Sequence, residues 1–139
     1  KRIRELQKEL NMAMLYISHD IAVIAEVSDR IGVMYAGRMA ELSDSVDIFK
    51  NPTHPYTYAL MGAFPSIKGK RRELKTLPGE PPDLLDPPSG CRFHPRCPYA
   101  TDVCCQKQPD FVPIDGVNRG DLTHGHYVAC WHPLEGVTL

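Results

Sequence analysis

The sequence has no cysteine in its first 90 residues, no surplus of either charge and no long apolar run. Sixteen Lys and Arg stand against seventeen Asp and Glu, which gives a formal net charge of −1. This balance argues against nucleic-acid binding driven by bulk positive charge. The longest apolar run, Met12 to Ile17, has six residues, whereas a membrane-spanning helix needs about 20. The first residues also lack the apolar core of a signal peptide.

The chain has 139 residues, a length that suits one compact domain or two small ones. Its composition differs between a first part without cysteine and a second part that contains all of them. All five cysteines lie between Cys91 and Cys130, and they are too few for a disulfide scaffold, which exceeds about 8–10% cysteine. The 13 prolines, by contrast, are more frequent than in an average protein. The chain begins at Lys1 without a Met, directly in a helical pattern, so we expect a piece of a longer protein.

The N-terminal half alternates between helical and strand patterns. The predicted elements are an amphipathic helix over 1–11, a buried strand over 12–17, a helix capped by Asp20, and strands over 31–35 and 38–41 joined at Ala36-Gly37. This order predicts an α/β sheet with at least one parallel pair. The sheet has too few strands to close, so the rest of it is expected elsewhere.

The middle of the chain changes from helices to a proline-rich segment. Ser43 or Asp44 is expected to cap a short helix through Phe49, and His54-Pro55-Tyr56 to open another, since Pro suits a first helical turn. From residue 65 to 90, repeated prolines interrupt any helix or strand, which predicts a linker. A basic run over 68–75 inside it is typical of a solvated linker, with contact to an acidic headgroup or RNA as the alternative.

Ser18-His19-Asp20 is the first candidate site, because it follows a predicted buried strand and precedes a helix. In α/β proteins ligands bind at this position. An imidazole there can donate to a phosphate oxygen or position a water, and Asp20 can cap the helix or orient the ring. A histidine satisfied by a loop carbonyl is the alternative that these residues alone leave open.

The cysteines are the second candidate site. Five residues separate Cys91 from Cys97, six separate Cys97 from Cys104, and 25 separate Cys104 from Cys130. None of these spacings is that of a zinc knuckle. Four thiolates meet the count for an iron–sulfur cluster, while zinc with histidine ligands, disulfides and free structural thiols stay open. The candidate nitrogen ligands are His94, His124, His126 and His132.

Several motifs together resemble one known family. Residues 16–31, YISHDIAVIAEVSDRI, resemble the switch-histidine segment of ABC-transporter ATPase subunits, and 33–38, VMYAGR, the strand pair that follows it. His54-Pro55-Tyr56-Thr57 and the run from Gly90 to Pro98, GCRFHPRCP, resemble the C-terminal extension of the oligopeptide/dipeptide transporter ATPases. The resemblance covers essentially the whole chain, and the combination of motifs makes it specific.

The resemblance implies the C-terminal part of an ATP-hydrolysing subunit that powers peptide import. His19 would contact the γ-phosphate of ATP and help position the attacking water, and Asp20 would stabilise the loop. The chain has no Gly-x-x-x-x-Gly-Lys-[Ser/Thr] loop, so ATP and Mg would be bound only by the full-length subunit and this piece alone should be inactive.

The same resemblance implies where the protein works and with what. The subunit would lie in the cytoplasm, peripheral on the inner face of the membrane, beneath permease subunits and paired with a second ATPase subunit. The isolated piece is expected to self-associate, because an apolar strand over 12–17 with open edges recruits another chain. Nucleic acid is not an expected partner.

For the cysteines, the resemblance implies a [4Fe-4S] cluster on Cys91, Cys97, Cys104 and Cys130, with zinc as the lesser alternative. Cys105 is an extra thiol, which leaves open which member of the adjacent pair binds. The expected fold is therefore a C-terminal piece of an ABC ATPase parallel sheet over 1–64 with flanking helices, a Pro-rich linker over 65–90, and a small irregular Cys-rich tail over 91–139. The competing function is a self-standing iron–sulfur or zinc-binding interaction or redox module.

Overall fold

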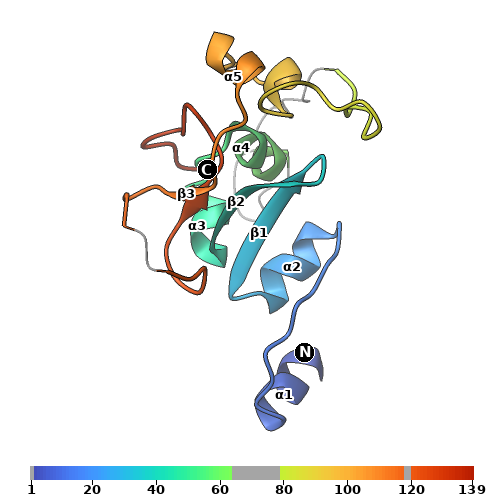
Figure 1. Cartoon of the computed structure of the whole chain (residues 1–139). Coiled ribbons are helices and arrows are strands. Elements are labelled where there is room, and N and C mark those ends of the chain that lie inside the picture. The colour runs from blue at the N-terminus through green and yellow to red at the C-terminus, as the bar shows by residue number, and fades with distance from the viewer. Residues whose placement is uncertain (1, 64–78, 118–119) are drawn as a thin grey trace.

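The computed structural model describes residues 2–63, 79–117 and 120–139. Six helical segments and four strands follow one another in this part of the chain (Figure 1). In chain order they are α1 Arg2–Glu9, α2 Ile21–Val27, β1 Arg30–Tyr35, β2 Arg38–Asp44, α3 Ser45–Lys50, α4 Pro55–Gly62, the 3₁₀ turn η1 His94–Arg96, α5 Asp102–Gln106, β3 Val112–Pro113 and β4 Tyr127–Val128. The strands form one sheet in the order β1-β2-β4-β3.

The β1–β2 hairpin centres the fold. Its two-residue turn has Ala36 at φ 48° and Gly37 at φ 76°, which is the doubly left-handed geometry of the tight turns that match strand twist. Arg30 faces Asp44 at one end of the ladder and Tyr35 faces Arg38 at the other. The predicted hairpin is confirmed.

The described residues do not contain the predicted parallel pair: every strand pair among them is antiparallel. Residues 12–17, expected as a buried strand, lie outside the sheet, and Leu15 and Ile17 are each 88% exposed. A buried parallel strand needs a partner for its backbone and a cover for each face. The described part of the chain supplies neither, and Figure 1 shows α1 and this segment extending away from the sheet.

A small apolar core lies beneath the hairpin. Ile31 and Val33 of β1 pack with Ile48 of α3 and Met61 of α4, and Ile21 and Ile24 of α2 pack against this group. Asp20 caps α2 as the sequence predicts, and His54, whose motif is expected to open a helix, caps α4 through its side chain. The start of each helix is therefore determined by a capping side chain next to it, and the apolar residues of both helices pack against the hairpin.

The tail, predicted to be irregular, instead completes the sheet. In β4, Tyr127 faces Leu42 and Val128 faces Glu41 of β2, and β3 then pairs with β4. Phe93, only 2% exposed, packs its ring against Tyr35 and Tyr56, with ring centroids 5.1 and 5.4 Å away. The tail is thus anchored on the hairpin by a strand and an aromatic contact.

The segment between the core and the tail has no regular structure where it is described. Residues 79–90 contain no helix or strand, while 64–78, including the basic run over 68–75, lie outside the described residues. Within those limits, no helix is long and apolar enough to cross a membrane.

Candidate functional sites

The His19 loop is held by the helix that follows it. Asp20 Oδ1 accepts hydrogen bonds from the amides of Ala22 and Val23, at 3.0 and 3.2 Å, and Ser18 Oγ accepts from the Asp20 amide at 3.0 Å. This geometry fixes the start of α2 as an N-cap does. His19 itself is exposed, and its imidazole is free to face a ligand that approaches this loop.

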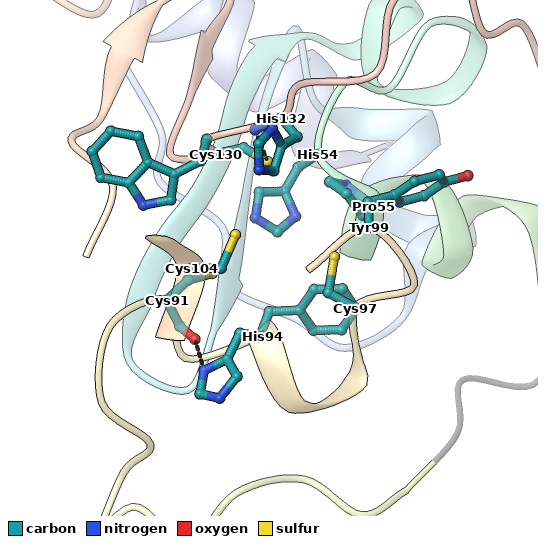
Figure 2. Close-up of a pocket in the computed structure, with 11 residues that line it drawn as sticks. His54, Pro55, Cys91, His94, Cys97, Tyr99, Cys104, Cys130 and His132 are labelled. Atoms are coloured by element: carbon teal, nitrogen blue, oxygen red, sulfur yellow. Dashed lines mark hydrogen bonds between the residues drawn. The ribbon is translucent and has the colours of Figure 1, made fainter. Parts of the chain in front are cut away.

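Four of the five cysteines face one pocket in the tail (Figure 2). Cys91, Cys97, Cys104 and Cys130 line this pocket. The remaining wall consists of His54, Pro55, Phe93, His94, Tyr99, Trp131 and His132. His19 does not line this pocket, so the two candidate sites are separate. All five cysteines are free thiols rather than disulfides.

Local backbone geometry explains why these cysteines meet. Gly90 adopts φ 67°, and a Cβ there would overlap the carbonyl oxygen of Cys104. The missing side chain lets the Cys91 amide donate to that carbonyl at 2.8 Å. On α5, Cys104 is buried and Cys105 is exposed, with its Sγ 3.8 Å from the Thr101 carbonyl oxygen. Helix geometry therefore selects Cys104, not Cys105, for the pocket.

Burial and mutual repulsion favour the protonated form of three of these thiols, Cys91, Cys97 and Cys130. Burial raises the pKa of Cys91 and Cys97, and raises that of Cys130 to about 12. Negative charge on the neighbouring cysteines would raise each further, while hydrogen bonds from backbone amides lower them. Four thiolates are stable together here only when a positive centre compensates them.

The arrangement differs from a single-ion site. Among the described residues, no group of three or more His, Cys, Asp or Glu side chains is placed to hold a metal ion. Zinc requires its thiolates about 2.3 Å from one atom. A four-iron cluster instead distributes its four thiolates over four irons, so its ligands stand farther apart around a larger centre.

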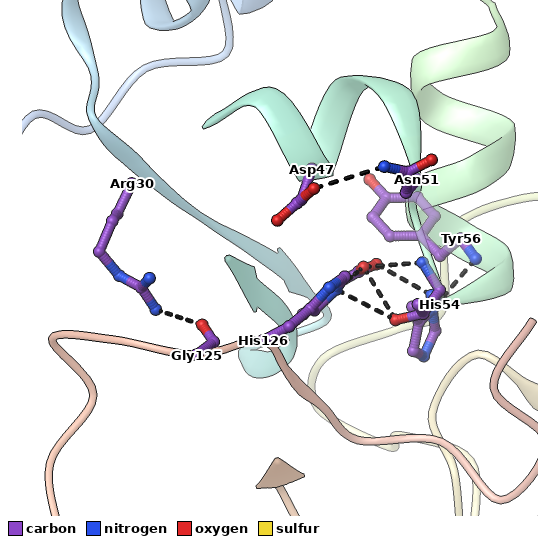
Figure 3. A network of polar contacts seen from close by, with 9 residues as sticks. Arg30, Asp47, Asn51, His54, Tyr56, Gly125 and His126 are labelled. Atoms are coloured by element: carbon purple, nitrogen blue, oxygen red, sulfur yellow. Dashed lines mark hydrogen bonds and ion pairs between the residues drawn. The ribbon is translucent and has the colours of Figure 1, made fainter. Parts of the chain in front are cut away.

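The buried side chain of Glu41 joins the sheet to the tail through hydrogen bonds to Thr53, His54 and His126; Figure 3 shows the polar network around His54 and His126. The Glu41 side chain is fully buried. Oε1 accepts from the Thr53 amide at 2.7 Å, from the Thr53 hydroxyl at 2.9 Å and from His126 Nε2 at 2.6 Å. Oε2 accepts from the His54 amide at 2.9 Å. One carboxylate therefore connects β2, the turn before α4, and the tail.

The hydrogen bonds outweigh the cost of burying this carboxylate. Burial alone would raise the pKa of Glu41, but the bonds from His126, Thr53 and His54 hold it below its usual value. Sequence reasoning missed this residue, because an acid in a hairpin strand is expected to face water.

Comparison of the sequence with known proteins identifies a family. The family profile "Oligopeptide/dipeptide transporter, C-terminal region" matches residues 40–104, which contain Glu41, His54 and three of the pocket cysteines. The oligopeptide transport ATP-binding protein OppD of Haemophilus influenzae is 41% identical over 99% of this chain and 40% of its own length. The chain belongs to this oligopeptide/dipeptide transporter family.

Two dipeptide transport ATP-binding proteins are also similar to this chain. The dipeptide transport ATP-binding protein DppD of Caldanaerobacter subterraneus is 44% identical over 82% of this chain and 35% of its own length. DppD of Escherichia coli is 43% identical over 94% of this chain and 38% of its own length. The chain thus spans about 35–40% of the length of these relatives.

His54, the first residue of the HPY sequence, has every polar atom engaged in this member of the oligopeptide/dipeptide transporter family. Its amide binds Glu41, its Nδ1 accepts from the Tyr56 amide at 3.0 Å, and its ring also bonds to the backbone of Ala129. Burial lowers the pKa of His54 to about 4, so the ring is neutral at pH 7. Because Ala129 precedes Cys130, His54 connects the start of α4 to the cysteine pocket.

Proposed function

We propose that this chain is the C-terminal part of the ATP-hydrolysing subunit of an importer for oligopeptides or dipeptides. The main support is its identity of 41% over 99% of the chain to an oligopeptide transport ATP-binding protein. ATP and Mg bind to the full-length subunit in this proposal, because the phosphate-binding loop is absent from this sequence. A self-standing module is disfavoured, since its relatives are subunits of transporters.

In this function His19 acts on the γ-phosphate of ATP and helps to position the attacking water. Its exposed ring on a loop fixed by the Asp20 cap supports that role. Phosphoryl transfer depends chiefly on such positioning and on charge stabilisation. Asp20 contributes by holding the loop.

The proposed partners are permease subunits in the membrane and a second ATPase subunit, with this subunit on the cytoplasmic face. The exposed apolar segment over 12–17 would add to the sheet of the same ATPase, covering Leu15 and Ile17. Self-association of the isolated piece through this segment stays a prediction. The division into units 1–64, 65–90 and 91–139 is also part of the proposal, with the tail anchored on the first unit through β4.

Peptide uptake by cells tests this function. Deleting the gene for the full-length subunit should abolish uptake of a labelled di- or tripeptide and leave uptake of a free amino acid unchanged. Expression of the gene from a plasmid should restore peptide uptake. Normal peptide uptake in the deletion strain, with no second peptide importer in that strain, would contradict the proposal.

We further propose that Cys91, Cys97, Cys104 and Cys130 hold a [4Fe-4S] cluster. The convergence of these thiols on one pocket carries this proposal, and backbone amides directed at their sulfurs support it. Four cysteines meet the ligand count of such a cluster, and zinc, which needs its ligands around one atom, is the alternative. The cluster would supply a positive core to compensate four thiolates that lie close together, of which Cys104 is buried and the other three are partly buried.

Anaerobic preparation of the chain tests the cluster. We expect iron and acid-labile sulfide in equal amounts, and loss of both when any one of the four pocket cysteines is replaced by Ser. Cys105→Ser is the matched control, since Cys105 is exposed on the same helix as Cys104, and it should retain the full content. One zinc per chain, or no iron in the unchanged chain under reducing conditions, would contradict the assignment.

A further inference from the structure

The four pocket sulfurs differ in the hydrogen-bond donors that they receive. Cys91, Cys97 and Cys130 each accept from the backbone amide two residues later, namely Phe93, Tyr99 and His132. The His132 amide lies 3.4 Å from Cys130 Sγ. Cys104 instead has a side-chain neighbour, the Thr101 hydroxyl, at 3.7 Å from its Sγ.

Thr101 is placed unusually for the residue that precedes a helix. It is the N-cap residue of α5, yet its side chain makes no capping hydrogen bond, although Thr in that position commonly caps through its oxygen. Its Oγ1 instead lies 2.7 Å from Nε2 of His132. The Thr101 hydroxyl thus contacts His132 and Cys104, which line the cysteine pocket, instead of capping its own helix.

Together these contacts join two distant cysteine segments. His132 binds Cys130 through its backbone amide and Thr101 through its ring, and Thr101 reaches Cys104 on α5. We propose that Thr101 and His132 form a clamp that positions Cys104 and Cys130, and that the Thr101 hydroxyl donates to the Cys104 thiolate when a cofactor is bound. This inference rests on the cysteine site proposed above.

The direction of the hydrogen bonds follows from the donors available. A metal-bound thiolate has no proton and only accepts, so the single Thr101 hydroxyl hydrogen must point at Cys104 Sγ. The Thr101 oxygen then accepts from His132, which requires the tautomer with the proton on Nε2. Donors to ligand sulfurs stabilise the more negative, reduced state of an iron–sulfur cluster and so raise its reduction potential.

Thr101→Val tests the clamp, because valine keeps the shape and removes the hydroxyl. Thr101→Ser is the rescue variant, since it keeps the donor. In the reconstituted chain, Thr101→Val should lose iron to a chelator about tenfold faster or more and shift the midpoint potential to a more negative value. Thr101→Ser should match the unchanged chain in both measurements. Equal potentials and loss rates in all three proteins would overturn the hydrogen bond to the cofactor.

Hydrogen exchange of the reduced, metal-free chain separates this inference from the cofactor assignment. Thr101→Val should speed exchange of the His132 amide relative to the Thr101→Ser variant, while exchange in β1 and β2 is unchanged. Unaltered exchange at His132 would overturn the clamp, whether or not a cluster forms. Faster exchange in a chain that takes up no iron would retain the clamp and refute the proposed cofactor and its hydrogen bond.

Discussion

Replacing Glu41 by alanine is expected to lower the free energy of unfolding by about 3–5 kcal/mol, the usual cost of removing one partner from a buried ionic group. The carboxylate accepts four hydrogen bonds from Thr53, His54 and His126. Alanine would leave the amides of Thr53, which is partly buried, and of His54, which is buried, without this acceptor. Because total stability is about 5–15 kcal/mol in most domains, this loss should be plain in urea denaturation.

A second acid on the same strand provides the control for Glu41→Ala. Asp44 pairs with Arg30 at 2.6 Å, but its side chain is 66% exposed. Asp44→Ala should therefore cost only about 0–1 kcal/mol. Glu41→Gln should fall between the two, because an amide keeps one acceptor oxygen but brings a donor toward the amides of Thr53 and His54. Equal stability of Glu41→Ala and Asp44→Ala would contradict the role assigned to the buried carboxylate.

Acidification is expected to destabilise the reduced, metal-free chain between pH 6.5 and 4. The pKa of His54 is about 4 in the fold against 6.5 in the unfolded chain. In that range the unfolded state binds a proton that the folded state does not, so stability falls as the pH falls. The shift corresponds to a loss of about 3 kcal/mol. Glu41 adds to it below pH 4.5, since its folded pKa is also lowered.

The His54→Asn variant isolates the histidine contribution. Asn does not titrate, and its side-chain oxygen can accept from an amide at a helix start as Nδ1 of His54 does. The variant should lose most of the slope of unfolding free energy against pH between 6.5 and 4.5, even if it is less stable at pH 7. An unchanged slope would show that another group carries the acid sensitivity.

Local chemistry made much of this fold predictable. A single carboxylate caps α2, Ala36 and Gly37 set the hairpin turn, and Pro55 marks the first turn of α4. Each of these features depends on residues within a few positions of one another. Sequence alone identifies such features because the determining contacts are short-range.

Features that depend on distant partners were not predictable. Residues 12–17 are apolar enough for a buried strand, but burial needs neighbours that the described chain does not place there. Strand β4 has only two residues, Tyr127 and Val128, and pairs with β2 more than 80 positions earlier. Glu41 is buried only because Thr53, His54 and His126 converge on it.

The sequence predicts which cysteines form the candidate site, but not how the chain brings them together. The sequence supplies the count and the spacing of the thiols, whereas their convergence depends on Gly90 bringing Cys91 to α5 and on the tail anchoring Cys130. The choice between Cys104 and Cys105 depends on which side of α5 faces the pocket. The sequence marks His132 as a candidate ligand, but its contact with Thr101 has no sequence signal, because 30 residues separate the two.

Peptide uptake with His19→Ala in the full-length subunit tests the proposed function most directly. We expect uptake to fall to the level of the deletion strain while binding of ATP to the purified subunit is largely kept, because His19 acts on the reacting phosphate rather than on affinity. Glu26→Ala, at an exposed position of α2, should transport normally. Wild-type uptake by the His19→Ala subunit would contradict the assignment.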